Sequence, residues 1–167
     1  HFDADPLIEE VLRQLDVPLD AVAVEVGALA VDLIARGLRP RQILTRAALD
    51  NAIASIATTG GSTNGVLHFL AIAHELGIDL NLDEFQTISG RTPLLADLKP
   101  GGRFVAPDLD RAGGIALVAK RLREAGLLNE EPLTVSGRTI GEEAERAEET
   151  PGQEVVRPVR DPIKQTG

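Results

Sequence analysis

Apolar residues recur every three or four positions over much of this chain, which is the spacing of amphipathic helices. The first such run covers residues 7–15. A second helix is predicted from Leu19 to about Ala35, and Gly37 with Pro40 marks its end. The first 35 residues are therefore predicted to be mostly helical.

Two further helices are predicted on either side of the sequence "TTGGSTN". Thr45 is a suitable N-cap for the first, and Gly60 with Gly61 suits a left-handed C-cap at its end. The second is predicted to start with Ser62 or Thr63 as its cap. Its buried stripe is predicted to be Val66, Leu67, Leu70, Ala73 and Leu76, with Gly77 ending the helix.

The rest of the chain has shorter patterns. A helical turn is predicted near residues 83–88, a helix from 113 and a charged helix from 140. Weak strand signals are Leu94–Leu95, Phe104–Val105 and the start of "LTVSGRT". These features favour an α/β fold, a helix-rich layered domain with a few short strands. Residues 151–167, with three prolines, read as a linker or as the first extended segment of another domain.

Composition narrows the classes of function. The formal net charge of −9 disfavours nucleic acid and anionic membrane surfaces as partners. No apolar run approaches the ~18 residues of a membrane span, and we expect a cytoplasmic protein. The chain has no cysteine, so it offers no thiolate nucleophile and no thiolate ligand. It also has no methionine, and we expect it to be a piece of a longer protein.

The segment from Gly60 to Asn64 has two interpretations. The first turn of a helix has backbone N–H groups without partners, its dipole attracts anions, and glycines let a ligand approach. Ser62, Thr63 and Asn64 could then donate side-chain hydrogen bonds to a ligand. Alternatively, the glycines only end one helix and the hydroxyl residues only cap the next.

Other candidate groups favour structural interpretations. His68 and His74 are six residues apart, which does not place them on one helix face as a zinc motif requires. His68 is predicted to be partly buried and His74 to be solvated. Asp108 and Asp110 are interpreted as acidic residues that complement a helix N-terminus.

Several motifs resemble the dihydroxy-acid and 6-phosphogluconate dehydratase family. The motifs are "NAIASIATTGGSTNGVLHFLAIAHELGIDLNLDEF", "PLLADLKPGGRFVAPDLDRAGG", "LTVSGRTIGEE" and "RPVRDPIKQTG". Their order fits from about Leu38 to the end, and the second resembles the dihydroxy-acid branch. The resemblance implies that residues 1–150 form the later part of the family's N-terminal α/β domain. Residues 151–167 would be a linker or the first strand of its barrel-like C-terminal domain.

The resemblance also implies a hydro-lyase that converts 2,3-dihydroxy carboxylic acids to 2-keto acids in branched-chain amino acid biosynthesis. Its enzymes use an iron–sulfur cluster and Mg²⁺, and a homo-oligomer is expected. The family's cluster cysteines, metal ligands and catalytic serine match no position here. We therefore expect this chain alone to bind neither cofactor and to be inactive, with Ser62, Thr63 and Asn64 as candidates for the substrate pocket. A sugar-acid dehydratase and a non-catalytic α/β assembly module are the alternatives.

Overall fold

The computed structural model describes residues 19–167, and the chain divides into two compact units, residues 1–39 and residues 40–167. The helix predicted at residues 7–15 lies outside the described residues. In the first unit the structure describes α2 (Leu19–Arg36), which confirms the predicted helix to within one residue at its end. Several of its large apolar side chains are exposed, namely Val24, Val26, Val31 and Ile34.

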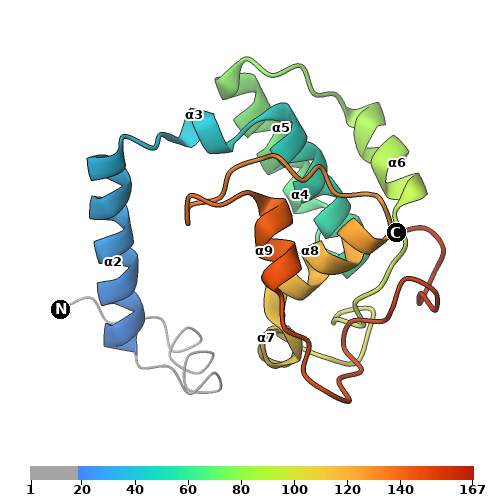
Figure 1. The fold of residues 1–167 in the computed structure, drawn as a ribbon. Coiled ribbons are helices and arrows are strands. Elements are labelled where there is room, and N and C mark those ends of the chain that lie inside the picture. Colours follow the sequence, from blue (N-terminus) through green and yellow to red (C-terminus); the bar gives the residue numbers. More distant parts are fainter. Residues whose placement is uncertain (1–18) are drawn as a thin grey trace. The chain divides into compact units, whose positions relative to one another are not determined.

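The second unit is built from short helices joined by loops (Figure 1). Its helices are α3 (Pro40–Ile43), α4 (Arg46–Thr59), α5 (Asn64–Leu76), α6 (Leu82–Arg91), α7 (Ala106–Ala112), α8 (Gly114–Glu124) and α9 (Ile140–Arg146). Within residues 19–167, no helix combines the length and the apolar character that crossing a bilayer requires.

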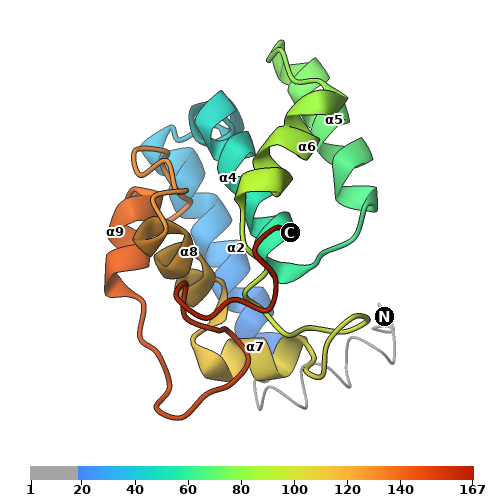
Figure 2. The same ribbon diagram turned by 90° about the vertical axis from the view of Figure 1, so that its right-hand side faces the viewer.

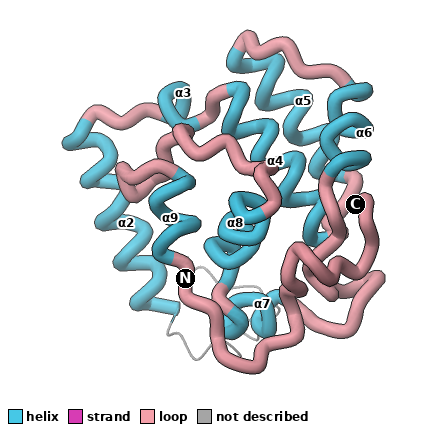
Figure 3. The backbone as a smooth tube through the Cα atoms, turned by 45° about the vertical axis from the view of Figure 1, so that its right-hand side comes forward, coloured by secondary structure: helices cyan, strands magenta, loops and turns pink. Residues whose placement is uncertain are grey.

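The predicted strands are reduced to isolated bridges. Leu94 pairs with Lys164, Leu98 with Phe104, and Leu133 with Thr139. Figure 3 accordingly draws the described chain as helices and loops. The helix-rich prediction is therefore confirmed, whereas the layer of short strands does not form in residues 19–167. Short apolar runs become strands only where a neighbouring segment extends the ladder.

Helix α4 is the central element of the second unit and contacts α5, α6 and α8 (Figures 1 and 3). The buried core joins this helix to α6, α7, α8 and two loop segments. Its members are Ile53, Ala54, Phe85, Ile88, Leu95, Ala96, Ala112, Leu117, Val118, Leu122, Val155 and Val156. Apolar burial around α4 thus fixes the position of the turn that follows it.

Side chains near the helix starts explain where several helices begin. The Thr45 hydroxyl accepts a hydrogen bond from the Ala48 amide at 3.2 Å, which confirms the predicted cap of α4. Asn81 and Glu84 form a reciprocal capping box at the start of α6, which is longer than the predicted turn. Thr139 and Glu142 do the same for α9.

Helix α7 was not expected, because the proline-rich sequence around it predicts a loop. Pro107 lies at the start of the helix, where a missing N–H costs nothing. The Asp108 carboxylate accepts a hydrogen bond from the Val105 amide at 3.0 Å and so caps the helix. The interpretation of Asp108 as a helix-start acid therefore holds for α7 and not for the helix predicted from residue 113. Asp110 lies inside α7, away from a helix start, and Asp108 also forms an ion pair with Arg111.

The predicted buried stripe of α5 is confirmed in part. Only Ala73 is fully buried, and Leu67 is 69% exposed. Val66 and Leu70 are half-buried and pack against the core of the second unit, and Leu76 is also half-buried. Leu67 is therefore the member of the stripe that the described residues leave uncovered.

The last segment of the chain packs onto the second unit. Val155 and Val156 are buried in the core, and the Gly167 amide donates to the Thr92 carbonyl at 2.6 Å. Gly167 therefore lies beside the end of α6 (Figure 2).

Candidate functional site

The segment from Gly60 to Asn64, here called the α4–α5 joint, is a tight helix-ending turn. Gly60 is left-handed (φ 62°), as predicted, but Gly61 is not. The amides of Gly60 and Gly61 donate back to the carbonyls of Ala57 and Ile56, at 3.4 and 2.9 Å. This is the double hydrogen bond of a Schellman motif, so a single left-handed glycine suffices to end α4.

Of the two residues predicted to cap α5, Ser62 and Thr63, the structure bears out Ser62. Thr63 has helical backbone angles and makes no capping hydrogen bond, so it is not the cap. The Ser62 hydroxyl instead accepts from the Asn64 amide at 3.2 Å. The Gly65 and Val66 amides donate to the carbonyls of Ser62 and Thr63. The first-turn amides expected to be available to an anion are therefore already bonded within the turn.

The three predicted site residues lie together and are exposed. Ser62, Thr63 and Asn64 all face solvent, whereas Gly65 packs closely on the end of α4. A Cβ added to Gly65 would lie 2.4 Å from the Cδ1 atom of Ile56. The close contact between Gly65 and Ile56 thus fixes the joint against α4. The polar side chains of the joint are exposed to solvent.

An open cavity of about 340 Å³ adjoins the joint. It lies among α4, α5 and α6, and its walls include Gly60, Gly61 and Thr63 together with Phe85 and Gly167. Ser62 and Asn64 do not line it. Of the predicted residues, Thr63 is therefore the one that a ligand in this cavity would meet.

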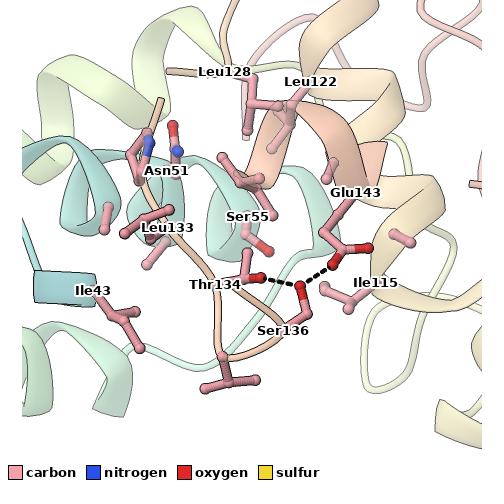
Figure 4. A pocket seen from close by; sticks show the side chains of 17 residues that line it. Ile43, Asn51, Ser55, Ile115, Leu122, Leu128, Leu133, Thr134, Ser136 and Glu143 are labelled. Atoms are coloured by element: carbon pink, nitrogen blue, oxygen red, sulfur yellow. Dashed lines mark hydrogen bonds between the residues drawn. The ribbon is translucent and has the colours of Figure 1, made fainter. Parts of the chain in front are cut away.

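A second, mostly apolar cavity of about 570 Å³ was not anticipated from the sequence (Figure 4). Its walls come from α3, α4, α8, α9 and the loop at residues 128–136. At one end the Ser136 hydroxyl lies between Thr134 Oγ1 and Glu143 Oε1, at 2.8 and 2.5 Å. No linear motif signals this cavity, because its walls come from five separate segments.

The ionisable group of the apolar cavity is Glu143. The hydrogen bond from Ser136 lowers the pKa of the Glu143 carboxyl, partial burial opposes this, and the neighbouring Arg138 lowers it further. Glu143 is therefore ionised near neutral pH and suited to accept hydrogen bonds rather than to act as a general acid.

The histidines do not form a site. His68 is exposed, which corrects the prediction of partial burial, and His74 is exposed as predicted. Within residues 19–167 there is no group of three or more His, Cys, Asp or Glu side chains that could hold a metal ion.

Comparison with known proteins decides the family. The model of the dihydroxy-acid/6-phosphogluconate dehydratase N-terminal region matches residues 16–143. The chain belongs to this dehydratase family. A dihydroxy-acid dehydratase of Koribacter versatilis (strain Ellin345) is 60% identical over 92% of the chain and 27% of its own length.

Two further dehydratases extend this finding. The dihydroxy-acid dehydratase of Roseiflexus castenholzii is 56% identical over 89% of the chain and 26% of its own length. That of a Thermus thermophilus strain is 52% identical over 86% of the chain and 26% of its own length. The chain spans about a quarter of the length of the curated relatives it matches. The α4–α5 joint lies within the matched region of this dehydratase family.

Proposed function

We propose that this chain is part of a dihydroxy-acid dehydratase. Such an enzyme removes the C2 proton and the C3 hydroxyl of a 2,3-dihydroxy carboxylic acid as water, and the resulting enol becomes a 2-keto acid. The reaction belongs to branched-chain amino acid biosynthesis, and we place it in the cytoplasm. The supporting observation is the 52–60% identity to three proteins that carry this name.

The residues of this chain do not fit an iron–sulfur cluster. Cluster ligation needs several thiolates, and the chain has none. Its described residues also contain no group of three or more His, Asp or Glu side chains that could hold a metal ion. In our proposal both cofactors, the catalytic groups and the contacts of a homo-oligomer come from other parts of a longer polypeptide.

We assign residues 1–150 to the later part of the family's N-terminal α/β domain. Residues 151–167 would lead toward its barrel-like C-terminal domain. The family match over residues 16–143 supports the first assignment. The second rests on the resemblance of "RPVRDPIKQTG" to the family's sequences.

We further propose that the α4–α5 joint lines the wall of the substrate pocket. The hydroxyl of Thr63 and the side-chain amide of Asn64 have no hydrogen-bond partner in the part of the chain that the structure describes. They are exposed on a rigid turn, and Thr63 borders a cavity. Ser62 would support these two residues, because its hydroxyl accepts a hydrogen bond from the backbone N–H of Asn64.

The experiment compares substrates in the full-length protein, purified without oxygen and supplied with iron, sulfide and Mg²⁺. Keto-acid formation from 2,3-dihydroxy-3-methylbutanoate, with a higher kcat/KM than 6-phosphogluconate, is expected. The reverse preference would replace our proposal with a sugar-acid dehydratase, which the family description also covers. No turnover of either acid by cluster-loaded protein would favour an assembly module.

The 167-residue chain alone serves as the control for the cofactor assignment. After the same reconstitution it should remain colourless and inactive. Stoichiometric iron with visible absorbance would contradict the assignment of the cluster to other segments.

A further inference from the structure

Four arginines converge on an open cavity of about 710 Å³ in the second unit, here called the arginine cavity. They are Arg103 from the loop before α7, Arg121 from α8, and Arg157 and Arg160 from the C-terminal segment. Two glutamates, Glu149 and Glu154, also line it. Such a gathering is unusual in a chain with a formal net charge of −9.

The arginines differ in how many of their N–H donors are already used. Arg121 is 7% exposed and is held by Glu124 and by Glu149 at 2.7 Å, so it forms the back of the cavity. The Nε–H of Arg103 donates a hydrogen bond to Asp97 Oδ2 at 2.5 Å. Arg103 Nη1 lies 3.6 Å from Glu154 Oε2, which is an ion-pair distance but too long for a hydrogen bond.

The C-terminal pair leaves more donors available. Arg157 uses its Nε and Nη2 on Asp161. Arg160 is exposed and forms no ion pair with any group of residues 19–167. A guanidinium has five N–H donors in a planar fork that suits oxyanions. The cavity therefore presents one whole guanidinium and parts of two others.

We propose that the arginine cavity binds a phosphoryl group or inorganic phosphate, with Arg160 as the main ligand and Arg103 and Arg157 as supporting donors. Donors from three chain positions suit the three terminal oxygens of a phosphoryl group better than the two of a carboxylate. Arg121 is paired with Glu124 and Glu149, so it shapes the back of the cavity and adds no uncompensated positive charge to it. This site is distinct from the α4–α5 joint and does not depend on the proposed dehydratase activity.

The test is calorimetric titration of the full-length protein with inorganic phosphate, with the ionic strength held constant by chloride salt. Arg91 provides the matched control, because it is an exposed arginine of α6 that also forms no ion pair within the described residues. Arg160→Gln should raise the phosphate Kd about ten-fold or more, whereas Arg91→Gln should leave it unchanged.

Two variants sharpen the test. Glu154 is exposed, and Glu154→Gln should lower the Kd about two- to five-fold because a negative charge leaves the lining. Arg160→Lys keeps the charge without the fork and should fall between wild type and Arg160→Gln. Circular dichroism and melting temperature check that each variant folds.

A parallel titration with glycerol 3-phosphate separates the two sources of the ligand. Tighter binding than inorganic phosphate points to a phosphorylated metabolite, and equal binding points to free phosphate. The proposal is wrong if neither compound binds, or if Arg160→Gln and Arg91→Gln change the Kd equally.

Discussion

Two short helix–helix junctions in the described residues, α4–α5 and α7–α8, contain a Gly-Gly pair, and they differ in what surrounds them. At the α4–α5 joint, Gly60 and Gly61 are exposed and beside an open cavity. At the α7–α8 junction, both glycines have positive φ, 135° for Gly113 and 66° for Gly114. A Cβ added to Gly113 would lie 2.4 Å from the Glu148 carbonyl oxygen.

The difference comes from a chain segment remote in sequence. Thr150 crosses the α7–α8 junction, where its amide and hydroxyl donate to the carbonyls of Ala112 and Arg111 at 3.1 and 2.6 Å. Within residues 19–167 no segment crosses Ser62, Thr63 and Asn64 in this way, and all three are exposed. The same dipeptide thus serves close packing at one junction, while at the other it leaves a surface free for binding.

The largest expected effect is at the covered junction. Gly113→Ala should reduce the free energy of unfolding by about 3 kcal/mol or more, because backbone strain adds to a clash with a carbonyl oxygen. Gly114→Ala is the control, since its nearest atom is 3.9 Å away, and should cost about 1 kcal/mol. Urea unfolding of the chain measures both. Equal losses of unfolding free energy would show that the segment with Glu148 and Thr150 does not make Gly113 more sensitive than Gly114.

The next effect separates binding from capping at the exposed joint. Thr63→Ala should lower kcat/KM of the full-length enzyme about ten- to a hundred-fold, through loss of a hydrogen bond to a charged substrate. It should leave the melting temperature unchanged, because Thr63 caps nothing. Ser62→Ala should instead cost about 0.5–1 kcal/mol of stability. If turnover by Thr63→Ala matches wild type, the joint is structural only.

A smaller effect is expected where the exposed joint meets α4. Gly65→Ala should cost about 1–2 kcal/mol, since the new methyl group would displace Ile56 Cδ1. Ile56→Val removes that atom, so the double variant should be less destabilised than the sum of the two single variants. Additive losses in urea unfolding would mean that the Gly65–Ile56 contact does not set the helix approach.

The smallest expected effect is the loss of stability at acid pH through Glu143 of α9. The pKa of Glu143 is lower in the folded protein than its usual 4.5, so this carboxylate stabilises the fold above that value. Its contribution, below about 1 kcal/mol, is lost as pH falls through the folded pKa. Unfolding midpoints at pH 6 and pH 4 should therefore differ less in Glu143→Gln than in wild type. Residues 60–64 contain no ionisable side chain, so the α4–α5 joint itself should not contribute to this pH dependence.

Local sequence signals located most of the helices. Thr45 marked the start of α4, and Gly60 and Gly77 marked two helix ends, because caps and left-handed glycines act within a few residues. Helix α7 escaped prediction because its cap, Asp108, bonds the Val105 amide in a sequence that reads as a loop.

Only the tertiary structure decided burial and the sites. The apolar spacing of α5 predicted a buried stripe, yet Leu67 is exposed, since periodicity does not say whether a partner is present. The exposure of Thr63 at the α4–α5 joint and the assembly of the arginine cavity both depend on how segments distant in sequence pack together. The sequence by itself determined most of the helices and the dehydratase family, because both depend on residues close together in the chain or on whole motifs. Long-range packing alone determined why one Gly-Gly junction is closed and the other is open.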